Sequence, residues 1–204
     1  MGDDLKDALR SGGVARLGTA AERAGRRLAA AADREGLVDV AVATVDSPLG
    51  PLHAAGTARG LVMLAYEEES FERRLDRLAA ELSPRILEAP ARLDGVRREL
   101  EEYFEGRRRR FDVPIDWSLT RGYAREVLRR TAEIPYGGAS SYAEIAYLAG
   151  SPRGWRAAGN ALGSNPIPIV VPCHRVLASG GGIGGYTGGL DRKRFLLGLE
   201  GVEA

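Results

Sequence analysis

The sequence predicts an α/β protein of the α+β kind, in which a small N-terminal sheet with helices precedes a mostly helical C-terminal domain that contains a helix-turn-helix. Short valine-rich and apolar segments, separated by turn residues, fill residues 38–66 and are typical of strands. After residue 119, apolar residues recur at helical spacing, and turns containing Gly or Pro interrupt them. The expected organisation is therefore a helical N-terminal extension (1–36), an α/β scaffold domain (37–118) and a mostly helical C-terminal domain (119–204).

Each element of the scaffold domain follows from a local pattern. The valines of the first segment favour a strand, a Ser-Pro-Leu-Gly turn follows it, and the next segment returns antiparallel. Leucines three and four residues apart then predict two helices. The expected strands are Val38–Val45, Pro51–Gly56, Leu61–Tyr66 and Arg110–Ile115, and the expected helices are Phe71–Leu82 and Leu93–Tyr103.

Three helices are expected at the start of the C-terminal domain. The first, Tyr123–Ala132, ends before an Ile-Pro pair, because the residue before proline resists the α conformation. The other two, Tyr142–Ala149 and Trp155–Leu162, are separated by the Gly-containing turn 150–154. Two helices joined by such a turn form the helix-turn-helix pattern, whose second helix can enter a DNA groove. The pattern alone also fits a helical hairpin that binds nothing.

Composition narrows the function classes. The chain has 204 residues, 44% of them hydrophobic and 28% charged, which is typical of a globular protein. No apolar run is long enough to span a membrane, and the acidic N-terminus does not look like a secretion signal, so a cytoplasmic location is expected. One cysteine and two histidines cannot build a structural zinc site, and no metal or cofactor is expected.

The small net charge of +1 is unevenly distributed. Residues 1–120 carry 19 basic and 22 acidic side chains, whereas the remaining residues carry 10 and 6. A polyanion is therefore expected to bind the C-terminal domain. The run of four arginines at 107–110 fits either a DNA contact or a solvated loop before a strand, and the second interpretation is the commoner one.

The only cysteine, Cys173, is followed directly by His174 at the end of an apolar run, residues 167–171. A thiol beside an imidazole is the simplest sequence form of an activated nucleophile. The plain alternative is a buried structural thiol, because free cysteine is among the most buried residue types.

The flanking motifs resolve this choice through a resemblance. Several blocks recur in a fixed order: Ile-Pro-Tyr-Gly at 134–137, Ser-Tyr at 141–142, Arg-Ala-Ala-Gly at 156–159, Asn-Pro-Ile-Pro-Ile-Val-Val-Pro-Cys-His-Arg-Val at 165–176, and Gly-Gly-Tyr-Thr-Gly-Gly-Leu at 184–190. This arrangement resembles the O6-alkylguanine-DNA alkyltransferases, also called methylated-DNA–protein-cysteine methyltransferases. The resemblance covers roughly residues 38–201 and is densest after residue 119.

The resemblance implies a single, irreversible transfer of an alkyl group from guanine O6 to Cys173. Such a displacement needs a thiolate, and a free thiol with a pKa near about 8.5 is mostly protonated at neutral pH. By resemblance, His174 removes the proton through a water and Glu200 orients the imidazole. Tyr142 supports protonation of the leaving guanine, and Asn165 ties down the turn before the reactive segment.

A base inside a duplex must be flipped out before the thiol can reach it. The resemblance assigns the insertion into the stack to Arg156 and the rotation of the target phosphate to Tyr142. Small residues on the recognition helix allow a close approach to the minor groove. The expected DNA-binding residues are Arg156, Tyr142, Ser141, Ala157, Gly159 and Trp155. The expected pocket residues are Leu162, Pro168, Val176, Tyr186, Thr187 and Lys193.

Some positions depart from the family pattern. Trp155 is bulkier than the residue expected beside Arg156, and it fits either a DNA contact or a helix anchor. Thr187 replaces a smaller residue and is expected to narrow the pocket. The expected partner is double-stranded DNA containing O6-alkylguanine, bound by a monomer, and O4-alkylthymine is left open as a second substrate. Two other functions remain: a non-transferring module that binds alkylated DNA and recruits repair factors, and a thiol hydrolase.

Overall fold

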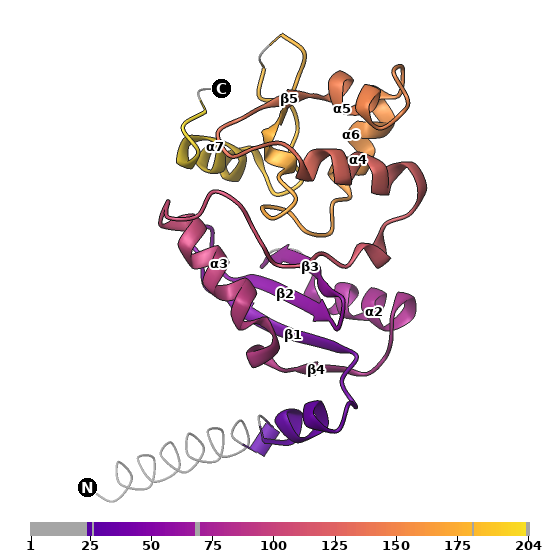
Figure 1. Ribbon diagram of the computed structural model, residues 1–204, viewed down its shortest axis with the longest axis vertical. Coiled ribbons are helices and arrows are strands. Elements are labelled where there is room, and N and C mark those ends of the chain that lie inside the picture. Colours follow the sequence, from indigo (N-terminus) through magenta and orange to yellow (C-terminus); the bar gives the residue numbers. More distant parts are fainter. Residues whose placement is uncertain (1–23, 26, 68–69, 181, 203–204) are drawn as a thin grey trace, which may run out of the picture.

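The computed structural model describes residues 24–25, 27–67, 70–180 and 182–202. Most of the predicted N-terminal extension lies outside the described residues, and within it residues 27–34 are helical. Among the helices of the described part, none combines the length and apolar character that crossing a membrane would need. The predicted fold class is confirmed: a sheet with helices is followed by a mainly helical part (Figure 1).

The N-terminal part is built on a four-stranded sheet. Its strands are β1 (Val40–Val45), β2 (Leu52–Thr57), β3 (Gly60–Tyr66) and β4 (Ile86–Glu88), in the order β3-β2-β1-β4. The first three strands are antiparallel neighbours, as the turn patterns predict, and β4 runs parallel to β1. The sequence analysis missed β4, because three residues are too few to show a strand pattern.

The two faces of the sheet bury different sets of residues. Val40, Val42 and Met63 pack with Leu78 of α2 (Phe71–Glu81) on one face. Alternate residues of the same strands, with α3 (Asp94–Phe104), belong to the other cluster, which continues into the C-terminal part. A short 3-10 helix, Pro90–Leu93, leads into α3. This alternation is the period of two expected of a strand buried on both sides.

The prediction of a strand at Arg110–Ile115 is wrong. Only Ile115 makes an isolated bridge, to Leu61 in β3. Pro114 has no N–H to donate to a ladder. The N–H groups of Asp112 and Val113 instead donate to the buried carboxylate of Glu99, at 2.8 and 3.3 Å. The Glu99 carboxylate thus accepts the hydrogen bonds that the carbonyls of a neighbouring strand would otherwise accept.

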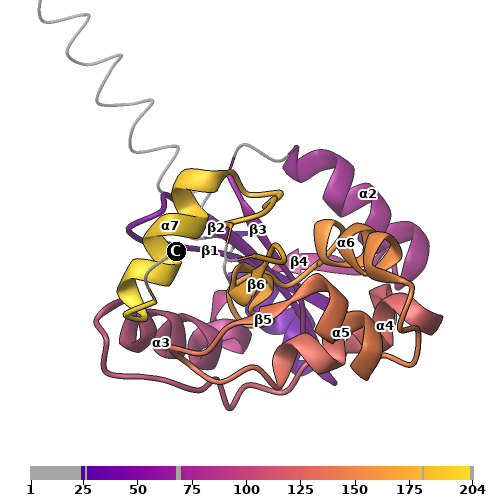
Figure 2. The ribbon, with the colours of Figure 1, turned by 90° about the horizontal axis from the view of Figure 1, so that it is seen from above.

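The C-terminal part carries four helices within the described residues. They are α4 (Gly122–Ala132), α5 (Tyr142–Leu148), α6 (Trp155–Gly163) and α7 (Leu190–Leu199). The first three match the predicted helices to within a residue or so, and α5 and α6 form the expected helix-turn-helix. The remaining elements are the 3-10 helices Trp117–Leu119 and Cys173–Arg175 and the short parallel pair β5 (Ser140–Ser141) and β6 (Val176–Leu177). Seen from above, α7 lies on the same side of the molecule as α3, and α5 lies on the other side (Figure 2).

The outer edge of β3 joins the two parts. The N–H of Leu64 donates to the carbonyl of Pro166 at 2.8 Å, and the N–H of Leu61 donates to the carbonyl of Pro114 at 2.8 Å. Gly60 is required beside this contact, because a Cβ there would lie 2.1 Å from the Pro114 oxygen. The segment that leads to Cys173 is therefore held against the sheet by the backbone hydrogen bond from Leu64 to Pro166.

Candidate active site

The apolar segment before Cys173 is a chain of tight turns. Ile169 has a φ of 72°, and the N–H groups of Val170 and Val171 donate within the segment, to Pro168 and Ile167. A positive φ in a β-branched residue is strained and persists only where the surroundings impose it. The segment is nevertheless buried, as its apolar sequence predicts.

Cys173 is the first residue of a 3-10 helix, and it is 8% exposed. Asn165 is its main polar neighbour: Nδ2 lies 3.1 Å from Sγ and also donates to the Val171 carbonyl at 2.9 Å. The Asn165 Oδ1 accepts from the Ile167 N–H at 3.0 Å. Burial raises the pKa of the Cys173 thiol, and the Asn165 amide and the charge of Lys193 oppose this only in part. The resting sulfur is therefore a thiol that needs a base.

The candidate base is the next residue in the chain, His174. His174 is fully buried, and its Nε2 lies 2.9 Å from Oε1 of Glu200 at the end of α7. Burial lowers the pKa of His174, so the imidazole is neutral at pH 7. Because an ionised carboxylate can only accept, Nε2 carries the proton and Nδ1 holds the free lone pair. Nδ1 has no hydrogen-bond partner among the described residues. This is the base and orienter arrangement of a catalytic triad.

Glu200 receives more donors than the sequence analysis expected. Arg175 donates to both of its carboxylate oxygens, through Nε at 2.8 Å and Nη2 at 2.9 Å. Tyr103 of α3 donates to Oε1 at 2.6 Å. Burial alone would raise the pKa of Glu200, but hydrogen bonds from His174, Arg175 and Tyr103 lower it to about 2. The carboxylate is therefore ionised throughout the physiological range.

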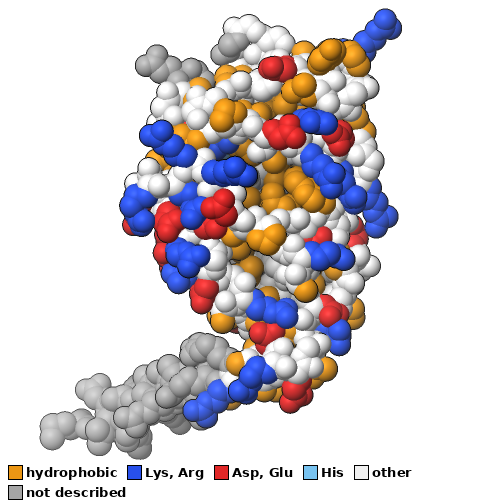
Figure 3. Space-filling model, viewed as in Figure 1, with side chains coloured by type: hydrophobic (Ala, Val, Ile, Leu, Met, Phe, Trp, Pro, Cys, Tyr) orange, Lys and Arg blue, Asp and Glu red, His pale blue; other side chains and the backbone are white. Residues whose placement is uncertain are grey.

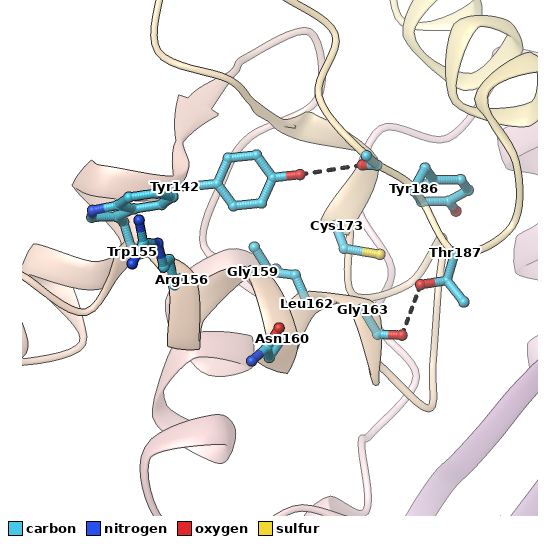
Figure 4. Close-up of a pocket in the computed structure, with 11 residues that line it drawn as sticks. Tyr142, Trp155, Arg156, Gly159, Asn160, Leu162, Gly163, Cys173, Tyr186 and Thr187 are labelled. Carbon is cyan, nitrogen blue, oxygen red and sulfur yellow. Dashed lines mark hydrogen bonds between the residues drawn. The ribbon is translucent and has the colours of Figure 1, made fainter.

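A cavity of about 630 Å³ opens above the thiol (Figure 4). α6 forms one wall and the glycine-rich loop before α7 forms the opposite wall. Tyr142 crosses between them, and its hydroxyl donates to the Gly185 carbonyl at 3.2 Å. Thr187 donates from Oγ1 to the Gly163 carbonyl at 2.7 Å. The predicted residues that line the cavity are Tyr142, Trp155, Arg156, Gly159, Leu162, Cys173, Tyr186 and Thr187.

Other predicted residues lie outside this cavity. Ser141 caps α5, accepting from the Glu144 N–H at 3.1 Å, and Ala157 is exposed on α6. Pro168 lines a smaller cavity of about 140 Å³ that also reaches Cys173. Val176 and Lys193 are buried, and Nζ of Lys193 donates to the Val176 carbonyl at 2.6 Å. Burial lowers the pKa of Lys193 to about 8.

The sequence analysis missed several residues of the site. Asn160 and Gly163 line the cavity and follow Arg156 by four and seven residues, so helical spacing alone could have identified them. Arg175 stood in the quoted motif without a role. Tyr103, however, is 97 positions from Glu200 in the chain, and no local pattern connects them.

On the face that Figure 3 shows, the charged side chains do not form one continuous basic field. Figure 3 shows basic and acidic side chains interleaved over the visible face. In the arginine run, Arg107 pairs with Glu105, and Arg108 bonds to Glu102 at 2.8 Å and Asp112 at 2.9 Å. These ion pairs fit the interpretation of this run as a solvated loop. Within the described residues, no cluster of three or more His, Cys, Asp or Glu side chains suited to a metal ion is present.

Comparison with known proteins agrees with this geometry. The family described as "6-O-methylguanine DNA methyltransferase, DNA binding domain" matches residues 122–202. The partner family, "6-O-methylguanine DNA methyltransferase, ribonuclease-like domain", matches residues 40–117. The chain belongs to the 6-O-methylguanine DNA methyltransferase family. Both matches together span most of the sequence, so the resemblance seen in the motifs is confirmed.

Individual members of the 6-O-methylguanine DNA methyltransferase family are similar over nearly their whole length. A methylated-DNA–protein-cysteine methyltransferase of Mycobacterium tuberculosis is 40% identical over 77% of this chain and 90% of its own. One from Methanosarcina barkeri is 39% identical over 76% and 94%. The crystal structure of the M. tuberculosis protein in complex with DNA superposes with a TM-score of 0.67, at 39% identity, over 78% of this chain and 92% of that chain.

Proposed function

We propose that this protein repairs DNA by transferring an alkyl group from guanine O6 in a duplex to Sγ of Cys173, once per molecule. One observation carries the proposal above all: the only cysteine lines the cavity beside α6, and the residue after it, His174, is hydrogen-bonded to the buried Glu200. The similar M. tuberculosis protein is named a methylated-DNA–protein-cysteine methyltransferase and has been crystallised with DNA.

The step begins with proton removal. Nδ1 of His174 accepts the Cys173 proton through a water, and Glu200 stabilises the imidazolium that forms. The thiolate then attacks the alkyl carbon, so that the S–C bond forms as the C–O6 bond breaks. Tyr142 supports protonation of the departing guanine. In balance, guanine gains the proton that the thiol loses, and the thioether is the end product of the single transfer.

Access to the base requires flipping, which costs a few kcal/mol of stacking and pairing. Arg156 enters the stack from the first turn of α6 and fills the gap, and Tyr142 crowds the target phosphate. The extruded guanine occupies the cavity between α6 and the glycine-rich loop. Asn165 holds the Cys173 sulfur in place and takes no part in bond making.

The direct test is intact-mass analysis after incubation with a duplex that contains O6-methylguanine. One methyl group should be added, and peptide mapping should place it on Cys173. Cys173→Ala should lose transfer and still bind the duplex. Absence of any added mass on folded protein, with binding intact, would instead favour a module that only binds alkylated DNA. Product formation far beyond about one equivalent would indicate a hydrolase.

We further infer that the protein acts as a monomer in the cytoplasm, where thiols stay reduced. A single chain supplies the thiol, its base and the DNA-facing helix, so no second copy is needed for the reaction. Sedimentation of the free protein at micromolar concentration should give the mass of one chain. A stable dimer that loses transfer on dilution would contradict this.

A further inference from the structure

A tyrosine of the N-terminal part reaches into the proton relay. The hydroxyl of Tyr103, in α3, donates to Oε1 of Glu200 at 2.6 Å. Tyr103 is fully buried and Glu200 is 6% exposed, so water does not compete for this hydrogen bond. The same oxygen lies 2.9 Å from Nε2 of His174. The N-terminal part therefore contacts the group that orients the base.

The ring of Tyr103 is held in place by other aromatic rings. Phe104 and Phe111 lie with their centroids 5.4 and 5.2 Å away, and Tyr136 lies 6.1 Å away, edge-on. Such contacts stabilise one ring orientation beyond the gain from burial. The hydroxyl is thus aimed at Glu200 by its surroundings.

The Tyr103 hydroxyl affects, through Glu200, how strongly His174 binds a proton. An ionised carboxylate oxygen has a limited number of lone pairs, and each donor takes part of its negative charge. Without the Tyr103 hydroxyl, Oε1 would attract the imidazolium proton more strongly. The charged and titratable groups that act on His174 and Glu200 are Arg175 and Lys193, which disfavour the imidazolium, and Tyr103. Tyr136 acts on Tyr103.

We propose that Tyr103 is a positioning residue of the relay, which fixes the Glu200 carboxylate and limits how basic His174 becomes. Tyr103 touches neither the thiol nor the cavity, and it acts only through Glu200. Its role in alkyl transfer rests on the proposed function, whereas its effect on His174 does not.

The pKa of His174 can be measured directly by NMR, because the chain contains only two histidines. Imidazole NMR titration of full-length protein should show the His174 pKa rising in Tyr103→Phe by roughly half a unit or more, since a hydrogen bond to the charged carboxylate is lost. Tyr136→Phe is the matched control, because its hydroxyl donates to the Leu199 carbonyl at 2.7 Å and not to Glu200.

Transfer kinetics provide the second arm. Because the base must be neutral, a higher His174 pKa should shift the acid limb of the rate–pH profile of Tyr103→Phe upward, with a smaller change at alkaline pH. An equal loss of rate at every pH, with an unmoved His174 pKa, would reduce Tyr103 to a packing residue and overturn the proposal. A wild-type protein that never transfers would refute the proposed function and leave the NMR result standing.

A measurement on the wild-type protein avoids dependence on the fold of a variant. With tyrosine labelled at Cζ, the Tyr103 signal should shift as His174 titrates, because both bond to one oxygen of Glu200. A Tyr103 signal that stays constant through that titration would also overturn the proposal.

Discussion

The guanidinium carbon of Arg156 lies 4.7 Å from the centroid of the Trp155 ring, at the mouth of the cavity above Cys173. Both residues belong to the first turn of α6, and Trp155 is half exposed. A cation over an exposed indole gains about 0.5–1 kcal/mol. The pair therefore presents an ordered cation and a large apolar surface on the helix that is proposed to enter the groove.

Trp155→Ala should weaken binding to a duplex with O6-methylguanine by about tenfold, because stacking of bases on an aromatic side chain contributes about 1–3 kcal/mol. The single-turnover rate at saturating DNA should change little, since Trp155 does not contact the thiol. Fluorescence anisotropy with labelled duplex and rapid-quench kinetics measure the two quantities. Tyr147→Ala is the control, because Tyr147 is an exposed aromatic on α5 that does not line the cavity. Equal losses in both variants would reduce Trp155 to a general surface contact.

The lowered pKa of Glu200 predicts how the free energy of unfolding depends on pH. Its folded pKa of about 2 lies below the ordinary value of 4.5, so its contribution is full above the unfolded pKa and is lost as pH falls from about 4.5 towards 2. Glu200→Gln should lower the free energy of unfolding by about 3–5 kcal/mol at pH 7, because the buried Arg175 loses its partner. The difference from wild type should shrink through that acid window. Urea unfolding between pH 2 and 7 measures it.

Asp39 supplies the comparison for that experiment. Hydrogen bonds from Arg85 and Ser83 also lower its pKa to about 2, but Asp39 and Arg85 form an exposed pair. Exposed pairs contribute little to stability. Asp39→Asn should therefore leave the acid dependence nearly as in wild type. A variant at Asp39 with as large an effect as the one at Glu200 would contradict the assignment of the acid transition to the relay.

Two glycines of the glycine-rich loop before α7, Gly188 and Gly182, differ in how closely other residues pack around them. A Cβ on Gly188 would lie 2.5 Å from Tyr66 and 2.8 Å from Tyr186, whose hydroxyls share a hydrogen bond of 2.8 Å. Gly188→Ala should therefore cost about 1–3 kcal/mol in unfolding free energy and slow transfer, as overpacking does. Gly182→Ala should be nearly neutral, because its Cβ meets only Ala178 at 3.8 Å. Thermal unfolding and transfer rates of both variants decide whether this packing shapes the site.

Local patterns were sufficient for most of the fold, whereas the centre of the site came from the family resemblance. Apolar spacing predicted the three helices before Cys173, and the resemblance implied that Glu200 orients His174. The strand expected at 110–115 did not form, because Pro114 has no N–H to donate. In addition, the Glu99 carboxylate accepts from the Asp112 N–H in place of a neighbouring strand. Contacts between distant segments, such as Tyr103 with Glu200, leave no periodic signal. The sequence therefore predicts the reacting groups better than the residues that hold them.

Thr187 connects the glycine-rich loop to the end of α6 through the hydrogen bond from Oγ1 to the Gly163 carbonyl, 2.7 Å long. Both residues line the cavity, so this contact limits its width. Thr187→Ala should slow methyl transfer several-fold, because a lost hydrogen bond of about 1 kcal/mol loosens the wall. Benzyl transfer should fall less, since a looser wall admits a larger group. Thr187→Ser keeps the hydroxyl and should restore the methyl rate. Single-turnover rates with the two substrates test this, and identical behaviour of the Ala and Ser variants would show that the methyl group of Thr187, and not its hydroxyl, sets the width.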